Sequence, residues 1–253
     1  MRIASLSPAA TEILFVLGKG KEIVCVDQFS NFPEDAKELP HVMDHQRISS
    51  EALRSFSPDL VLTQTVIQEA LSTKLKEDGF SVVHQDPRKL SELFEAILAT
   101  GILVDAEQAA SRLISGMQKE LKDLQKKARL LPKKLTVYCE EWHRPPMASG
   151  NWVPEMIAAA GGRSFPIDPG QLSREVSLEE VAMFDPSLIV ISWCGAGRLA
   201  DKYLLLQRPE WDQLEAVRNG NVKVIDDSLL NRPGPRLIEG ARQLYGWLFE
   251  MLH

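Results

Sequence analysis

SEALRSFSPDLVLT, residues 50–63, and LEEVAMFDPSLIVI, residues 178–191, are two versions of one pattern. Aligned 128 positions apart, they match Glu51 with Glu179 and place a phenylalanine, a proline and a leucine at the same three positions. Each copy predicts a short helix that begins near the glutamate, a turn at the proline and a buried strand. A repeat at half the chain length indicates two lobes of related build.

Around both copies, short apolar segments alternate with helical ones. In the first half we predict strands near residues 3–6, 23–26, 60–62 and 82–83, and in the second half near 135–138, 188–191 and 222–225. This alternation is typical of parallel α/β sheets. The sequence therefore predicts a parallel sheet in each lobe.

Residues 105–131 have apolar side chains at helical spacing, and no proline interrupts them before Pro132. A helix of about 25 residues is roughly 40 Å long. It could pack along one lobe, but a rigid strut between the lobes explains its length better, and a flexible linker would be rich in Gly and Ser. The predicted fold class is α/β, with lobes at 1–104 and 132–253 bridged by a single long helix over 105–131.

Composition narrows the class of partner. The 253 residues are 44% hydrophobic and 25% charged, with a formal net charge of −6 spread along the chain. Nucleic-acid binding, which calls for a basic stripe, is not expected. No apolar run approaches the ~20 residues that span a bilayer. Residues 1–18 lack the continuous apolar core and cleavage site of a signal peptide, so we assign them to the fold; whether a signal or lipid anchor was removed stays open.

The chain carries no motif typical of a catalytic or metal centre. There is no nucleophile elbow, phosphate-binding loop or His-Glu-x-x-His pair, and the five histidines are scattered. Cys139 and His143 could suggest a thiol nucleophile with a base, but adjacency in sequence supplies neither a positioned base nor an oxyanion stabiliser. We expect no enzyme activity, no cofactor and no bare metal ion.

Aromatic, amide and arginine side chains follow the predicted strands, at the ends where open α/β sheets bind ligands. These candidate contacts are Phe29, Phe32, Gln64, Trp142, Met147, Trp193 and Arg232. Any one of them could be a packing residue. Together they favour a large, partly apolar ligand between the lobes.

Glu51 and Glu179 have two explanations. A glutamate in the first turn of a helix is common because it interacts favourably with the helix dipole. Two carboxylates at equivalent positions of two lobes would also suit a partner that has two basic pockets.

Six segments in this order resemble the vitamin B12 and iron-siderophore substrate-binding proteins of ABC importers. They are SLSPAATEILFVLG, DQFSNFP, SPDLVLTQ, PPMASGNWVPEMIAAAGG, EVSLEEVAMFDPSLIVIS and NRPGPRLIEGARQL, and they cover essentially the whole chain. The resemblance implies two α/β lobes joined by one long helix, ligand capture and delivery to a membrane permease. It is closest to the cobalamin-binding branch, and it implies a periplasmic or other extracytoplasmic location. We expect a monomer.

The resemblance also implies roles for residues. Phe29, Phe32, His45, Gln64, Met147 and Arg232 match positions that contact the corrinoid, and Glu51 and Glu179 match glutamates that dock onto permease arginines. His45 and Gln64 stand where well-known B12 binders carry tryptophan, and Met147 replaces an aromatic residue. We expect His45 to stack or hydrogen-bond, with axial coordination of cobalt as the alternative. A ferric siderophore or haem remains an alternative ligand, and a cytoplasmic corrinoid-handling protein or enzyme an alternative class.

Overall fold

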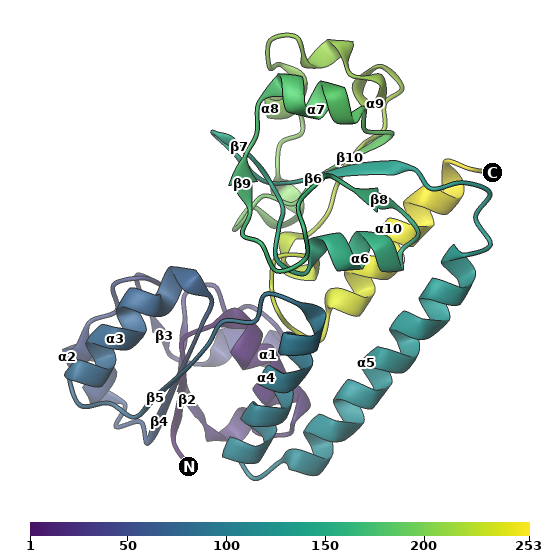
Figure 1. Ribbon diagram of the computed structural model, residues 1–253. Coiled ribbons are helices and arrows are strands. Elements are labelled where there is room, and N and C mark those ends of the chain that lie inside the picture. The colour runs from purple at the N-terminus through teal and green to yellow at the C-terminus, as the bar shows by residue number, and fades with distance from the viewer. The chain divides into compact units, whose positions relative to one another are not determined.

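The computed structural model describes residues 1–253, which divide into two compact units. The first unit contains Met1–Pro87 and Ser91–Gly116, and the second contains Arg88–Leu90 and Met117–His253. Helix α4 (Leu90–Leu103) is followed by the long helix α5 (Glu107–Ala128), drawn in teal in Figure 1, along which the chain passes from the first unit into the second. The helix predicted over 105–131 is confirmed with slightly shorter bounds.

The sheet of the first unit is entirely parallel, as predicted. Its strands are β1 (Ile3–Ser5), β2 (Ile23–Asp27), β3 (His41–Val42), β4 (Leu60–Gln64) and β5 (Val82–Gln85), in the order β3-β2-β1-β4-β5. The strand order reverses between β1 and β4. In open α/β sheets the carboxyl ends of strands at such a reversal form the ligand crevice.

Helices cover this sheet because its strands are apolar on both faces. The helices are α1 (Pro8–Val16), α2 (Ser50–Ser55) and α3 (Glu69–Glu77), with short 3₁₀ turns η1 (Gly20–Glu22), η2 (Glu34–Glu38) and η3 (Val66–Gln68). Leu53 of α2 and Leu71 and Leu75 of α3 are buried in one cluster with Val61 of β4 and with Leu6, which follows β1. Because this core is packed, the loops that follow the strands are held in defined positions.

The sheet of the second unit is mixed, so the prediction of a parallel sheet is wrong for this half. Its strands are β6 (Thr136–His143), β7 (Pro146–Ala148), β8 (Arg163–Ser164), β9 (Arg174–Glu175), β10 (Leu188–Ile191) and β11 (Val222–Val224). β8, β10 and β11 form parallel ladders around β6, whereas β7 is antiparallel to β6 and β9 is antiparallel to β7. Only Arg144 and Pro145 connect β6 to β7, and so short a connection produces a hairpin rather than a parallel crossover.

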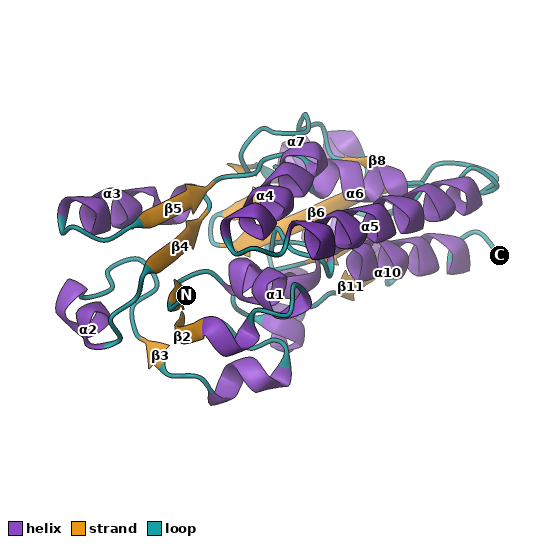
Figure 2. Ribbon diagram, turned by 90° about the horizontal axis from the view of Figure 1, so that it is seen from below, coloured by secondary structure: helices purple, strands orange, loops and turns teal.

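The helices of the second unit are α6 (Val153–Ala159), α7 (Leu178–Phe184), α8 (Tyr203–Leu206), α9 (Glu215–Arg218) and α10 (Leu237–Glu250), with 3₁₀ turns η4 (Gly197–Leu199), η5 (Trp211–Gln213) and η6 (Asp227–Leu229). Val181 of α7 and Ala216 of α9 pack with Tyr138 on one face of the sheet. α10 lies beside the second half of α5 in both ribbon views (Figures 1 and 2), and Arg242 forms an ion pair with Glu120 between them.

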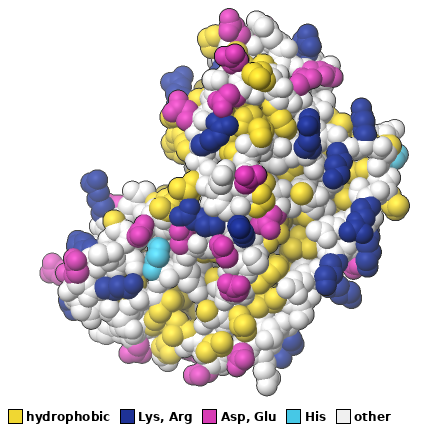
Figure 3. All heavy atoms as spheres, viewed as in Figure 1, with side chains coloured by type: hydrophobic (Ala, Val, Ile, Leu, Met, Phe, Trp, Pro, Cys, Tyr) yellow, Lys and Arg dark blue, Asp and Glu magenta, His cyan; other side chains and the backbone are white.

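Figure 3 shows Lys and Arg side chains gathered along the edge that α5 forms. This agrees with the Lys-rich sequence of its second half. None of the helices combines the length and the apolar character that crossing a membrane requires.

Candidate functional site

Polar side chains gather at the carboxyl edge of the first sheet, where the strand order reverses. Gln64 ends β4 and is 2% exposed, and both the oxygen and the nitrogen of its side-chain amide form hydrogen bonds. Ser7 Oγ, just after β1, donates to Gln64 Oε1 over 2.8 Å, and Gln64 Nε2 donates to Gln85 Oε1 over 3.2 Å. Burial and these bonds give Gln64 a supporting role at the edge rather than an open contact surface.

His45 is held by a buried carboxylate. Asp27 ends β2 and is 0% exposed; its Oδ2 lies 2.8 Å from His45 Nδ1, and its Oδ1 accepts a 2.5 Å hydrogen bond from Ser30 Oγ. Gln68 Nε2 donates to the carbonyl oxygens of Leu6, at 2.6 Å, and of His45, at 3.0 Å. Both the ring and the backbone of His45 are therefore fixed, and the ring stays 19% exposed.

Two phenylalanines near the end of β2 lie at the surface, and one of them packs against this histidine. Phe29 is 42% exposed and Phe32 is 40% exposed, although apolar residues nearby fill the core. The Phe29 ring meets the His45 ring edge to face, with 5.4 Å between centroids. The first unit thus presents exposed aromatic rings, one of them next to a fixed imidazole; that Phe29, Phe32 and His45 contact a ligand stays a prediction.

In the second unit, a buried ion pair holds the end of β6. Glu140 is 0% exposed and accepts hydrogen bonds from Tyr138 Oη at 2.9 Å, Trp193 Nε1 at 2.8 Å, and both terminal nitrogens of Arg208 at 2.7 and 2.8 Å. The Arg208 guanidinium also lies 4.5 Å from the centroid of the Trp211 ring. Trp193 is buried here, so it supports the site through its hydrogen bond to Glu140 and has almost no surface of its own.

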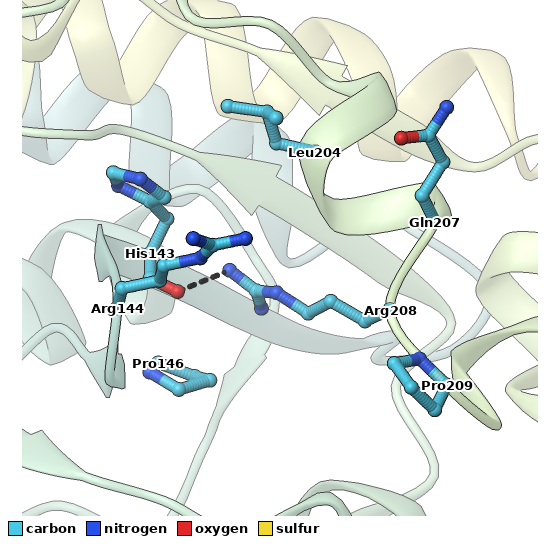
Figure 4. Close-up of a pocket in the computed structure, with 7 residues that line it drawn as sticks. All are labelled: His143, Arg144, Pro146, Leu204, Gln207, Arg208 and Pro209. Carbon is cyan, nitrogen blue, oxygen red and sulfur yellow. Dashed lines mark hydrogen bonds between the residues drawn. The ribbon is translucent and has the colours of Figure 1, made fainter.

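The β6–β7 turn is bonded to this ion pair. Arg208 donates to the carbonyl oxygen of His143 over 2.8 Å, the bond drawn in Figure 4. The turn borders a pocket of about 380 Å³ that Leu204, Gln207 and Pro209 line from the α8 side. The buried pair therefore fixes one wall of this pocket.

The β6–β7 hairpin carries two of the candidate contact residues on paired strands. Trp142 and Met147 are cross-strand partners, and Trp142 is 41% exposed. The indole N–H of Trp142 donates to the carbonyl oxygen of Arg144 over 2.9 Å, so its polar atom is satisfied. The ring of His143 packs against Trp193 at 4.8 Å between centroids. The structure thus brings Trp142, Met147 and Trp193 together, with only Trp142 and Met147 reaching the surface.

Arg232 is the candidate contact farthest along the chain. It is partly buried in the loop between η6 and α10. Its neighbour Asn231 bonds to both the carbonyl oxygen and the hydroxyl group of Ser192, at the carboxyl end of β10. Asn231 therefore ties the Arg232 loop to the same edge of the second sheet.

Glu51 and Glu179 occupy the same position in two equivalent helices. Ser49 caps α2 and Ser177 caps α7, so each glutamate is the second residue of its helix. Both carboxylates are exposed, and the residues two positions further on, Leu53 and Val181, are fully buried. The helix dipole accounts for a glutamate at this position. Because both carboxylates are exposed, both are also accessible to a partner.

The thiol that suggested nucleophilic chemistry is sealed in the core. Cys139 is 2% exposed, and burial raises its pKa to about 12. A nucleophilic cysteine needs the opposite environment, one that lowers the thiol pKa.

Sequence reasoning missed three residues that organise the site. Asp27 carried a signal, because a charged residue at the end of an apolar strand is unusual. Glu140 carried the same signal, but its partner Arg208 lies 68 positions further on in a region without any recognisable pattern. No local rule could have paired them.

Comparisons with known proteins agree with this architecture. An uncharacterised ABC transporter substrate-binding lipoprotein of Bacillus subtilis is 29% identical, over 96% of this chain and 78% of its own length. A vitamin B12-binding protein of Vibrio cholerae is 28% identical, over 98% of this chain and 88% of its own length.

A solved periplasmic haem-binding protein of Roseiflexus superposes with a TM-score of 0.86 at 24% identity, over 100% of this chain and 99% of that one. At this identity the likeness concerns the fold alone, and it confirms the predicted fold class. The family model described as periplasmic binding protein matches residues 3–229. The chain belongs to this periplasmic binding protein family.

Proposed function

We propose that this chain captures a cobalt corrinoid of the cobalamin type and delivers it to the permease of an ABC importer. The observation that carries the proposal is the pair of exposed rings of Phe29 and Phe32 at the carboxyl edge of the first sheet, with Phe29 packed against a fixed imidazole. The vitamin B12-binding relative, matched over nearly the whole chain, supports the corrinoid as ligand class.

Family membership confirms the prediction of a substrate-binding component rather than an enzyme. Such a component works outside the cytoplasm, as the periplasmic family and the lipoprotein relative indicate. We propose that it acts as a monomer with a small-molecule metal chelate and permease subunits as partners.

Each unit supplies its own contact residues in this proposal. On the first unit, Phe29, Phe32 and His45 contact the ligand, and on the second, Trp142, Met147 and Arg232 do so. Rigid aromatic side chains give a large apolar contact at little cost in conformational entropy. Gln64 and Trp193 act indirectly, because their burial and hydrogen bonds hold the strand ends that carry the contact residues.

Docking on the permease is assigned to Glu51 and Glu179. Both are exposed at the start of a capped helix, and each helix buries one apolar residue, Leu53 or Val181, in the core of its unit. A rigidly mounted carboxylate pair suits arginines, which bind carboxylates with two parallel hydrogen bonds. Charge reversal of both glutamates should abolish uptake of corrinoid in cells while leaving binding by the purified protein unchanged. The same change at Glu107, an exposed first-turn glutamate of α5, serves as the control.

Binding is tested by titrating cyanocobalamin into the purified protein and into Phe32→Ala and Trp142→Ala. We expect saturable one-to-one binding by calorimetry that each substitution weakens. Phe249→Ala is the matched control, because Phe249 is 43% exposed but belongs to α10, away from the strand ends. Equal loss in the control would show that the aromatic surfaces named here are not the binding surface.

Haem is the second candidate, and the His45–Asp27 pair is the observation that favours it. Haem offers a flat apolar ring and an iron atom that accepts imidazole. A ferric siderophore already surrounds its iron, so His45 would add no metal bond to it.

A further inference from the structure

The tautomer of His45 is determined by its neighbours. Gln68 Nε2 lies 3.3 Å from His45 Nδ1, but its two hydrogens are already directed to the carbonyl oxygens of Leu6 and His45. The remaining partner of Nδ1 is the Asp27 carboxylate at 2.8 Å, which can only accept. Nδ1 therefore carries the proton, and the lone pair of the neutral imidazole lies on Nε2.

Nε2 is the atom left to react. It makes no hydrogen bond within the protein, and it is not sealed in the interior. Asp27 itself is supported by Ser30 Oγ and by the backbone N–H of Phe29, the latter at 3.3 Å, so its position does not depend on His45. A carboxylate that binds one imidazole nitrogen and directs the other outward is the usual arrangement behind a metal-bound histidine.

The backbone of the loop is also fixed. Asp44 precedes His45 with φ 64°, and it accepts hydrogen bonds from the N–H of Arg47 through both its carbonyl and its side chain. Gln28 Oε1 accepts the N–H of Asp44 over 3.1 Å. The imidazole is thus preorganised, which reduces the entropy lost when it forms a bond.

Resting on the proposed function, we infer that His45 Nε2 is an axial ligand to the metal of the bound chelate, with Asp27 as its positioning residue. One imidazole supplies one ligand, so the other ligands come from the chelate, which must be a macrocycle with an exchangeable axial position. With a corrinoid that carries an axial water, such as aquocyanocobinamide, Nε2 forms a cobalt–nitrogen bond in the binding step and that water leaves. The oxidation state of cobalt does not change, and no proton moves because it already sits on Nδ1.

The test compares two corrinoids that differ only at the axial positions. Aquocyanocobinamide carries one exchangeable water, whereas both axial positions of dicyanocobinamide hold cyanide. Calorimetry reports binding of either compound, and the visible absorption spectrum reports axial ligation. We expect aquocyanocobinamide to bind more tightly and with a shift of its absorption bands, and dicyanocobinamide to bind without a shift.

Variants assign the effect to the residue pair. His45→Ala should remove the spectral shift and weaken aquocyanocobinamide more than dicyanocobinamide, because only the first compound can lose a cobalt–nitrogen bond. Circular dichroism and a thermal melt check that the variant is folded. Asp27→Asn should weaken aquocyanocobinamide by about 10- to 100-fold, the usual cost of losing such a partner, with little effect on dicyanocobinamide. His41→Ala is the control, because His41 Nδ1 lies 3.0 Å from the backbone oxygen of Asp27 and does not bond to the Asp27 carboxylate.

The outcomes separate this inference from the proposed function. Binding of both corrinoids with equal affinity and no spectral shift would overturn axial ligation and leave corrinoid capture intact. Absence of binding to either compound would overturn corrinoid capture itself and, with it, cobalt ligation. A shift that persists in His45→Ala would assign the axial bond to another residue and refute the inference.

Discussion

Replacing Arg208 with methionine removes the only cation that neutralises the buried carboxylate of Glu140. The carboxylate would keep its bonds from Tyr138 and Trp193, but both charge-assisted bonds from Arg208 would be lost. The Arg208 side chain is only 13% exposed, so water cannot readily take its place. Leaving a buried charge unpaired costs about 3–5 kcal/mol of the free energy of unfolding. At roughly 2–4 °C per kcal/mol, the melting temperature should fall by about 6–20 °C.

Intrinsic fluorescence is the suitable assay. All five tryptophans lie between residues 142 and 247, within the second unit, so their emission follows the unit that contains the ion pair. Adding Glu140→Gln to Arg208→Met removes the unpaired charge. The amide oxygen can still accept from Trp193 Nε1, and the amide N–H can donate to Tyr138 Oη. The double variant should recover at least ~1 kcal/mol relative to additivity. Arg218→Met, at an exposed arginine, should change stability by less than about 0.5 kcal/mol.

Two results would refute this assignment. One is a loss of less than about 1 kcal/mol in the free energy of unfolding of Arg208→Met, and the other is a double variant whose loss equals the sum of the two single losses. Either result would mean that water or a local rearrangement neutralises Glu140. The β6–β7 turn should also loosen in Arg208→Met, because the bond to the carbonyl oxygen of His143 disappears.

Two further predictions concern stability. In α10, a Cβ at Gly240 would lie 2.1 Å from the Leu229 carbonyl oxygen, so Gly240→Ala should destabilise the protein by roughly 1–3 kcal/mol or more in thermal melts. Gly246→Ala in the same helix meets nothing within 4 Å and should stabilise it by up to ~1 kcal/mol; a reversed order would contradict the packing. Burial lowers the pKa of His84, so its contribution to stability is present above the unfolded pKa and lost as pH falls through the folded pKa. Urea unfolding between pH 7 and pH 5 should therefore show a loss that His84→Asn reduces, and an unchanged slope in the variant would refute the assignment.

The fold was largely predictable because its signals are local. The paired helix–proline–strand segments indicated two related units, and the helical spacing of apolar residues before Pro132 indicated α5. The mixed sheet was not predicted, because β7 and β9 are three and two residues long and carry no alternating pattern. The direction of β7 follows from the two-residue turn after His143.

The candidate site was predictable only in part. All five residues Phe29, Phe32, Gln64, Trp142 and Trp193 were candidates because they follow predicted strands. In the structure Phe29, Phe32 and Trp142 are exposed, whereas Gln64 and Trp193 are buried. Whether a side chain at a strand end turns outward depends on partners far along the chain. Asp27 with His45 and Glu140 with Arg208 are such pairs, and only the tertiary structure reveals them.

Corrinoid capture is tested most directly by a calorimetric competition on the unmodified protein. Cyanocobalamin, hemin and a hexadentate ferric siderophore are titrated separately, and each is then titrated in the presence of the others. The proposed function predicts saturable one-to-one binding of cyanocobalamin that the siderophore does not displace. Saturable binding of the siderophore, with no heat from cyanocobalamin, would contradict it.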